Sequence, residues 1–390
     1  MKPSVLHIID TLGVGGAEQL MTGAVMHLPD FNHHVVYLKD PDGPRARLPI
    51  GCRVKKLNYR GKRDIFCCAL QLREYLKKYN IRIVHSHLYM ATVIARIGCP
   101  KDVRLFSTIH SLGSRNYFER SFPRLLEKMT YRSRHHLIAI CNEVLDDYSR
   151  CIGLRGPYTI LYNYVEDEFF SGEYKRFNRE NGLRLIAVGN LKAAKNYSYL
   201  VEAFRRLPQN VHLDVYGSGE MEHELKQLIR EYAVKIRLCG VREDIHKVLK
   251  QYDAFIMSSQ YEGQPLALLQ AMASGIPAIL SDIPVLREAT NNHAVFYDLS
   301  DPTDLVRKIH SILRGEINLD LFAEAGMKRA KKIADKENYM HRLRNLYLHA
   351  EMPQLTAAAG GPGLGTENKK SSKSSDNPHQ SFQWLRPVPE

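Results

Sequence analysis

Short apolar runs alternate with amphipathic stretches along the first half of the chain. Five of these runs predict buried strands, at 5–9, 33–38, 82–87, 104–110 and 136–141. Apolar residues recur at helical spacing after Gly16 and again near 66–79 and 120–132. Strands that alternate with helices are typical of a parallel sheet covered by helices on both faces.

The same alternation restarts in the second half of the chain, after a loop-like stretch. Further strands and helices are predicted at 183–189, 197–207, 212–217, 220–232, 235–240, 254–259 and 277–282. Glycines stand at the carboxyl ends of several strands, where doubly wound sheets bind ligands. The pattern therefore predicts an α/β protein of two Rossmann-like, doubly wound domains that face a cleft.

These patterns also set the domain boundaries that we predict. The first domain takes 1–165, a linker takes 166–182 and the second domain takes 183–335. A helix at 336–352 follows, which we expect to pack back toward the first domain. Residues 353–390 are poor in apolar residues and rich in Gly, Ser, Lys and Pro, a composition that predicts a disordered tail.

Charge is distributed unevenly along the chain. The 390 residues carry a net charge of +13, and 1–165 supply +12 of it, with 25 Lys and Arg against 13 Asp and Glu. A basic face suits a phosphate-bearing ligand, an anionic membrane surface or nucleic acid, while the simpler alternative is a solvated surface. Nucleic acid is disfavoured because the basic residues are dispersed and lack the interleaved aromatic residues of RNA-binding motifs.

Cysteine usage and hydropathy indicate where the chain works. Its seven cysteines are scattered and form no C-x-x-C pair, which argues for a reducing compartment and against a disulfide scaffold or a zinc site. No apolar run reaches the roughly 18 residues of a membrane-spanning helix. We therefore expect a cytoplasmic protein, peripheral on the inner face of the membrane if it binds one.

A glycine turn follows the first predicted strand, in DTLGVGGAEQ (10–19). Gly15 and Gly16 open a helix whose N-terminal N–H groups can approach a phosphate. Glu18 stands where the dinucleotide fingerprint G-x-G-x-x-G has its last glycine, so a nicotinamide enzyme is disfavoured. A tight strand–helix turn without a ligand is the alternative.

Three loops after strands of the second half have a similar character. VGNLKAAKN (188–196) places Lys192 and Lys195 before a helix, where a lysine can meet a phosphate as a point charge. YGSGE (216–220) and LCGVREDI (238–245) offer glycine turns suited to backbone contacts with a nucleotide. Each signal is weak alone, since a solvated lysine or a plain turn explains it equally well.

The longest motif is EGQPLALLQAMASGIP, at 262–277. Pro265 suits the first turn of a helix, and the free N–H groups of 264–267 favour an anion in front of them. Glu262 stands just before that turn, and Gln270 lies two helical turns further on. The stretch thus combines an acid, an anion-binding helix end and an amide.

With these motifs in this order, the chain resembles the retaining, nucleotide-sugar-dependent glycosyltransferases of family four, which have the glycosyltransferase B fold. The resemblance runs over roughly 1–350 and rests on GGAE (15–18), HSH (85–87), STIH (107–110) and the stretches just described. It implies a metal-independent hexosyltransferase that moves a sugar from a UDP- or GDP-sugar to a glycan or lipid-linked acceptor, in cell-surface polysaccharide or glycolipid synthesis. The nucleotide sugar is the donor substrate, and no cofactor is expected.

The resemblance also implies roles for single residues. His110 and Glu262 would meet the transferred sugar and Lys195 would bind the diphosphate, which makes these three the catalytic candidates. Together with the loops above, it assigns donor contacts to Gly15, Gly16, Asn190, Gly217, Val241, Gly263, Gln264, Pro265, Leu266 and Gln270. The family often has arginine at the position of Asn190 and has a second glutamate at that of Gln270. Because charge-assisted hydrogen bonds are about twice as strong as neutral ones, we expect weaker donor binding rather than lost chemistry.

Metal binding is not expected. The D-x-D at Asp40-Pro41-Asp42 lies in a stretch with Gly and Pro, which predicts a β-turn. His85 and His87 share one face of a strand, but without a cysteine or carboxylate pair beside them they favour a structural role or a contact with the acceptor.

Two other functions and a membrane contact stay open. A sugar-nucleotide 2-epimerase shares the fold but needs acid and histidine groups for proton abstraction, and no such convergent set is evident. A catalytically weak nucleotide-sugar-binding protein would fit Asn190 and Gln270. The predicted helix at 120–132 sets basic residues around Phe122 and Leu125, as a membrane-surface helix does, although a core helix with a basic outer face is the alternative.

Overall fold

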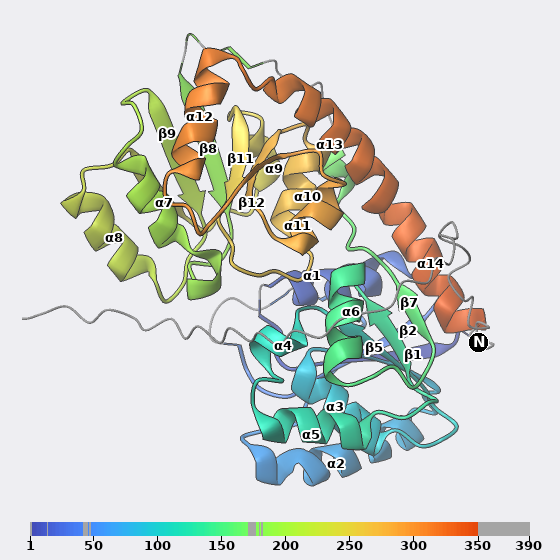
Figure 1. Cartoon of the computed structure of the whole chain (residues 1–390). Coiled ribbons are helices and arrows are strands. Elements are labelled where there is room, and N and C mark those ends of the chain that lie inside the picture. The colour runs from blue at the N-terminus through green and yellow to red at the C-terminus, as the bar shows by residue number, and fades with distance from the viewer. Residues whose placement is uncertain are drawn as a thin grey trace, which may run out of the picture. The chain divides into compact units, whose positions relative to one another are not determined.

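Two parallel sheets organise the chain (Figure 1). The computed structural model describes residues 2–13, 15–41, 46, 48–170, 177–178, 180 and 182–349. Asp42 of the D-x-D motif, part of the predicted linker and the predicted tail at 353–390 lie outside these residues. The chain up to Met352 forms one compact unit.

The first sheet has seven parallel strands in the order β3-β2-β1-β4-β5-β6-β7. These are β1 (Ser4–Ile9), β2 (Asn32–Tyr37), β3 (Arg53–Lys56), β4 (Ile83–His87), β5 (Arg104–Ile109), β6 (His136–Ala139) and β7 (Tyr158–Ile160). Its helices are α1 (Gly16–His27), η1 (Lys62–Asp64), α2 (Ile65–Lys78), α3 (Tyr89–Gly98), α4 (Gly113–Asn116), α5 (Ser121–Thr130) and α6 (Asn142–Cys151), and η2 (Asp167–Phe170) then leads to the second sheet. The strand order reverses between β1 and β4, so the loops after these strands flank a switch point where such sheets bind ligands.

The second sheet has six parallel strands in the order β10-β9-β8-β11-β12-β13. These are β8 (Leu183–Val188), β9 (Val211–Tyr216), β10 (Ile236–Gly240), β11 (Ala254–Met257), β12 (Ala278–Ser281) and β13 (Val295–Tyr297). Its helices are η4 (Ala193–Lys195), α7 (Tyr197–Phe204), α8 (Glu222–Glu231), α9 (Ile245–Leu249), α10 (Leu266–Ala273), α11 (Pro284–Thr290), α12 (Asp304–Arg314) and α13 (Leu319–Ile333). Its switch point lies between β8 and β11.

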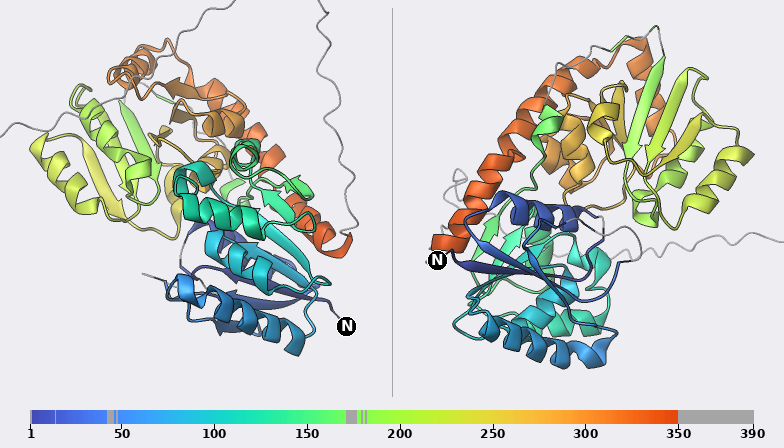
Figure 2. Two further views of the ribbon diagram at one scale, coloured as in Figure 1. Left: turned by 60° about the horizontal axis from the view of Figure 1, so that its bottom comes forward. Right: turned by 180° about the vertical axis from the view of Figure 1, so that it is seen from behind.

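Alternate residues of the central strands β1 and β8 supply cores on opposite faces of the two sheets. Leu6 of β1 packs with α2 and α3, whereas Val5 packs with α1 and with α14 (Lys336–His349). In the second sheet, Leu185 packs with α7 and α12, and Ile186 packs with α10 and α11. The views in Figure 2 show helices against both faces of each sheet. The predicted fold class, two doubly wound parallel sheets, is confirmed.

The last described helix, α14, completes the core of the first sheet. Tyr339, Met340, Leu343 and Tyr347 are buried together with Phe106 of β5. No helix in the described ranges has both the length and the apolar character needed to cross a membrane.

Three short strands at sheet edges escape the sequence pattern. β3 and β7 have three or four residues and are partly exposed, so they present no apolar run. β13 has three residues and lies at the far edge of the second sheet. Edge strands need not bury both faces, and their composition is therefore a weak signal.

Candidate active site

An ion pair joins the loops on the two sides of the second switch point. Lys195 follows β8 and its Nζ donates to Glu262 Oε1, after β11, at 2.5 Å. The hydroxyl of Ser259 donates to the same oxygen at 2.6 Å. Ser258 donates to the carbonyl oxygens of Lys195 and Asn196 at 2.8 and 3.0 Å. Two of the three catalytic candidates are therefore in direct contact and firmly held.

Glycines let the loops after β8 and β9 pack closely beside this pair. A Cβ at Gly217, whose φ is +145°, would lie 2.0 Å from the carbonyl oxygen of Gly189. A Cβ at Gly189 would in turn lie 3.6 Å from Lys195 Nζ. Asn190 is exposed in the same loop. Gly217 and Asn190 thus lie near the lysine, as donor-binding residues would.

The loop before α10 brings the third catalytic candidate to the site. A Cβ at Gly263 would lie 2.3 Å from the carbonyl oxygen of His110, just after β5 of the first sheet. Gln264 is buried, and its Oε1 accepts from the backbone N–H of Asn163 at 2.6 Å. Pro265 is the N-cap of α10, so the helix begins at Leu266 rather than at the proline.

Two predicted donor contacts stand apart from this cluster. Gln270 is half-buried on α10, and its side chain makes no hydrogen bond to any part of the chain that the structure describes. Val241 follows β10 and is 68% exposed. Both are open to a ligand, but no recorded contact links them to Lys195 or Glu262.

A buried carboxyl, that of Glu18, lies at the glycine turn after β1. Gly15 is the N-cap of α1, and a Cβ there would lie 2.6 Å from Glu18 Oε2. Nothing lies within 4 Å of a Cβ built on Gly16, so that side of the turn is open. Burial raises the pKa of Glu18, and a hydrogen bond from Thr11 and the charge of Lys192 act against this rise. The positive charge of Lys192, in the loop after β8, therefore favours the ionised form of a carboxyl at the first domain's glycine turn.

Histidines continue from His110 into the first sheet. Burial lowers the pKa of His110 to about 4, so its ring is neutral at pH 7. Its Nε2 lies 3.2 Å from Nδ1 of His87 on β4. His85 shares that face of β4, and its two ring nitrogens lie 2.6 Å from the hydroxyls of Tyr347 and Thr108. The histidine pair of β4 therefore has two separate sets of partners.

Three further residues belong to the site that sequence reasoning did not assign to it. Ser259 lies at the end of a predicted strand, and no motif gave it a role. Glu18 was noted only because it replaces the last glycine of the G-x-G-x-x-G pattern. Asp10 accepts from the backbone N–H of Ala91 at 2.7 Å and so holds the start of α3. Leu88, the N-cap of the same helix, has a φ of 67°, in the left-handed region that favours glycine.

Two family models match the chain. Residues 173–329 match the glycosyl transferases group 1. Residues 14–169 match glycosyltransferase family 4. The two stretches include every predicted site residue. The chain belongs to the family 4 glycosyltransferases.

Relatives of this glycosyltransferase agree with that assignment. The UDP-Gal:alpha-D-GlcNAc-diphosphoundecaprenol alpha-1,3-galactosyltransferase of Escherichia coli is 28% identical over 244 residues, which span 55% of this chain and only 61% of that protein. The putative glycosyltransferase EpsD of Bacillus subtilis is 24% identical over 291 residues, 68% of this chain and 76% of EpsD. The structure of Anabaena HepE in complex with UDP-glucose superposes with a TM-score of 0.74 at 14% identity, over 88% of this chain and 98% of HepE. At that identity the superposition shows the fold alone.

In this glycosyltransferase, the family and the enzyme class predicted from the sequence are confirmed. The roles of single residues stay predictions, since they follow from position and contact alone. The strongest of them concern Lys195 and Glu262, because these side chains meet beside the N-terminus of α10.

Proposed function

We propose that this enzyme transfers a hexosyl group with retention, without a metal, from a UDP- or GDP-sugar to a glycan or lipid-linked acceptor. The contact between Lys195 and Glu262 at the second switch point carries the proposal. A lysine at such a position suits a diphosphate, and a carboxylate beside it suits sugar hydroxyls.

The charges at this point fit the bond that must break. The bond between the anomeric carbon and the diphosphate oxygen breaks, and its electron pair goes to the diphosphate. The acceptor oxygen attacks from the same face and its proton passes to a diphosphate oxygen. Lys195 and the first N–H groups of α10 stabilise the growing negative charge. Glu262 gives up the lysine when the donor arrives and turns to the sugar.

The acceptor proposal draws on a relative and on an unusual helix. The E. coli relative is named for a diphosphoundecaprenol substrate. In this chain, α5 exposes its apolar side: Phe122, Leu125 and Met129 are 44%, 57% and 59% exposed. Glu127 is the one buried residue of that helix. A helix that buries its acid and exposes its apolar stripe suits an apolar partner.

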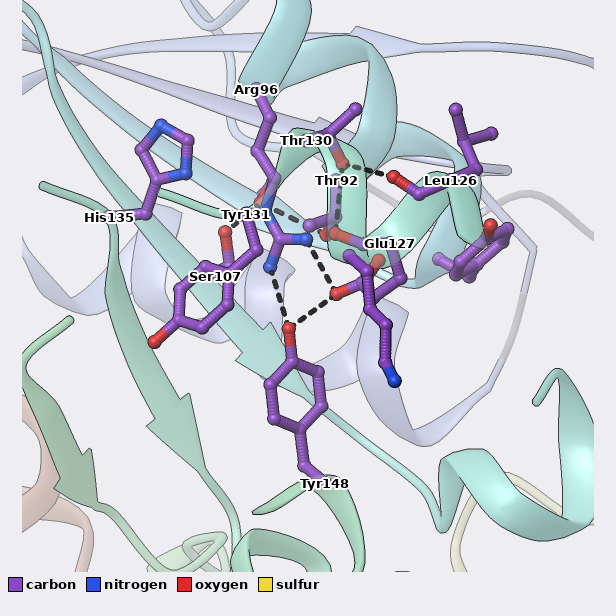
Figure 3. Close-up of polar contacts among 12 residues, drawn as sticks. Thr92, Arg96, Ser107, Leu126, Glu127, Thr130, Tyr131, His135 and Tyr148 are labelled. Atoms are coloured by element: carbon purple, nitrogen blue, oxygen red, sulfur yellow. Dashed lines mark hydrogen bonds and ion pairs between the residues drawn. The ribbon is translucent and has the colours of Figure 1, made fainter. Parts of the chain in front are cut away.

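The buried acid holds α5 in this orientation. Figure 3 shows Arg96 of α3 and Glu127 pointing toward each other, with the hydroxyl of Tyr148 beside them. Arg96 donates to Glu127 Oε1 at 2.5 Å and Tyr148 donates to the same oxygen at 2.6 Å. The pair therefore fixes the face that α5 turns to solvent.

The neighbouring helix α2 adds two exposed apolar side chains to this surface. Phe66 and Leu70 are 70% and 60% exposed. Lys62 Nζ, just before α2, lies 4.2 Å from the ring centroid of Phe122. We call Phe66 and Leu70, with Phe122, Leu125 and Met129, the apolar patch. Residues 60–78 and 115–134 hold 12 Lys and Arg against 4 Asp and Glu. Apolar side chains within a basic surround fit an anionic bilayer, where each basic residue contributes about 1 kcal/mol.

The proposal places the enzyme in the cytoplasm, docked by this patch on the inner face of the membrane. Flotation with vesicles of phosphatidylglycerol and phosphatidylcholine tests the docking. Wild type should float with the anionic vesicles and not with phosphatidylcholine alone, and Leu125→Ser with Met129→Ser should abolish flotation. Leu321→Ser is the matched control, because Leu321 is 67% exposed on α13. If flotation did not depend on lipid charge, or if the double variant floated like wild type, the apolar patch would not be the membrane-binding surface.

A thermal-shift screen with UDP-, GDP- and ADP-sugars tests donor binding. A true donor should raise the melting temperature, since a ligand at 100 times its Kd stabilises the fold by about 2.7 kcal/mol. Lys195→Ala should lose most of that shift and most of the transfer activity, and product analysis should show the anomeric configuration retained. Binding without turnover over a broad acceptor panel would instead indicate a binding protein, and an altered sugar nucleotide without acceptor would indicate an epimerase.

A further inference from the structure

Histidines form a row on one face of the first sheet, outside the ion pair of the donor site. His7 of β1 lies opposite His85 of β4, and His87 follows two residues later on the same face. His7 Nδ1 lies 3.4 Å from His87 Nε2, and His87 Nδ1 lies 3.2 Å from His110 Nε2. The row His7–His87–His110 thus ends on a catalytic candidate.

All three rings of this row are neutral at pH 7. Burial lowers the pKa of His7 and His87 well below the usual value, and neighbouring histidines lower both further. Burial lowers the pKa of His110 as well. A neutral imidazole has one N–H donor and one lone-pair acceptor. Both contacts of the row are therefore hydrogen bonds only if every ring carries its proton on Nδ1, or every ring on Nε2.

The far end of the row decides between these two arrangements. His7 Nε2 is buried and has no hydrogen-bond partner among the residues of the described chain. With protons on Nε2, His7 would bury an N–H without an acceptor, which folded proteins avoid. With protons on Nδ1, it buries only a lone pair. The neighbouring ring of His33 also has one nitrogen without a partner among the described residues. Its Nε2 lies 2.8 Å from the carbonyl oxygen of Leu28, and its buried Nδ1 makes no hydrogen bond.

We infer that His87 and His7 are positioning residues that hold His110 as the Nδ1–H tautomer and fix its ring at the end of β5. His110 then offers a fixed N–H donor, because its Nε2 accepts from His87. Such a donor suits a hydroxyl oxygen of the sugar or the acceptor. That use rests on the proposed function, whereas the tautomer does not.

A metal ion is the competing use of the same face. The ligand atoms of His7, His85 and His87 lie within 4.8 Å of one another. Zinc would draw such atoms to about 2.0–2.1 Å from the ion and would take lone pairs that the row uses as acceptors. It would also pull His85 from Tyr347 or Thr108, its partners at 2.6 Å. The hydrogen-bonded row needs no such rearrangement.

Nitrogen-15 NMR of the histidine rings in the full chain tests the tautomer without any activity assay. In wild type, His110 and His87 should carry the proton on Nδ1, and His87→Leu should turn His110 into a mixture of tautomers. Protonated Nε2 on His110, or a tautomer indifferent to His87→Leu, would overturn the inference. Ring signals that shift as added Zn²⁺ binds in equal molar amount would assign the face to a metal and overturn it as well.

Kinetics then separates positioning from general structure. His87→Leu should lower kcat about 10- to 100-fold through the misplaced ring, with a donor KM close to that of wild type. His87→Asn should recover part of the loss, since its amide N–H can take the place of Nδ1–H. Tyr347→Phe removes one of the two hydroxyl partners of His85 and should lower stability while leaving kcat nearly unchanged. Equal kcat losses in His87→Leu and Tyr347→Phe would show that the row is merely structural.

Discussion

The carboxyl of Asp10, just after β1, is buried where its ionised form is disfavoured. Burial raises its pKa to about 6, although hydrogen bonds from Ala91 and Met90 and the charge of Lys39 lower it. A folded-state pKa above the unfolded value means that the native chain binds more protons between about pH 4 and 6. The stability contributed by this group is therefore present at low pH and lost as the pH rises through 6.

Asp10→Asn should remove this pH dependence. The amide oxygen can still accept from Ala91, but no charge has to be buried. We expect the free energy of unfolding to rise by up to about 3 kcal/mol at about pH 7.5, the equivalent of a shift of two pKa units, and by only about 1 kcal/mol near pH 4.5. Urea unfolding at both pH values measures it. An equal difference in unfolding free energy between variant and wild type at both pH values would show that burial does not disfavour the ionised carboxyl.

Gln270 offers a second prediction at the scale of one residue. Its side chain has no hydrogen bond in the described structure, and the sequence resemblance implies that a glutamate would be expected at this position. If it meets the donor, Gln270→Glu should tighten donor binding by about 1 kcal/mol, the typical gain from charging one partner of a hydrogen bond. Titration calorimetry with the nucleotide measures it, with Gln227→Glu, exposed on α8, as the control for net charge. Equal affinity in both variants would leave the amide without a role in donor affinity.

Residues that sequence alone could and could not assign differ in the range of their contacts. Lys195 and Glu262 could be proposed from the sequence because each stands in a local motif at a strand end. Gln264 was predicted as a donor contact of this loop, and the hydrogen bond of its Oε1 with Asn163, 101 residues away, is one that no local motif signals. The row from His7 to His110 depends on the register of β1, β4 and β5, which no local pattern encodes.

At the scale of elements, periodicity predicts an apolar stripe but not the direction it faces. The stripe of α5 was read from the sequence with two alternatives, a core helix and a membrane-surface helix. In the structure this stripe faces solvent, because Arg96 lies beneath the helix and forms a buried ion pair with Glu127. A single buried charge therefore outweighs the orientation that the apolar residues would favour.

Glu127→Gln should show how much of α5 depends on this pair. Removing one partner leaves Arg96 buried and unpaired, which costs about 3–5 kcal/mol. Adding Arg96→Met should restore most of that stability. Thermal and urea unfolding measure both, with Glu202→Gln as the control because its pairs with Arg205 and Arg206 are exposed. A loss in Glu127→Gln no larger than in Glu202→Gln would contradict the anchoring role.

At the scale of the whole described chain, a few contacts join the elements of the two sheets. Glu288 of α11 accepts from the backbone N–H groups of Asn142 and Glu143 at 2.8 and 3.0 Å, at the N-terminus of α6. Gly263 packs against the carbonyl of His110. The doubly wound pattern of each sheet could be predicted from the sequence, but these contacts could not, since they join segments more than 140 residues apart.

Gly263→Ala tests whether the contact with His110 sets the geometry of catalysis. The added Cβ would lie 2.3 Å from a backbone oxygen, so the loop or the end of β5 must move. A displacement of about 1 Å can cost 10²-fold in rate, whereas overpacking typically costs only 1–3 kcal/mol of stability. We expect transfer to fall far more than the melting temperature, with Gly61→Ala as the control because nothing lies within 4 Å of its Cβ. A fully active Gly263→Ala would mean that His110 and the Glu262 loop act without this contact, and the assignment of His110 to the sugar would lose its structural support.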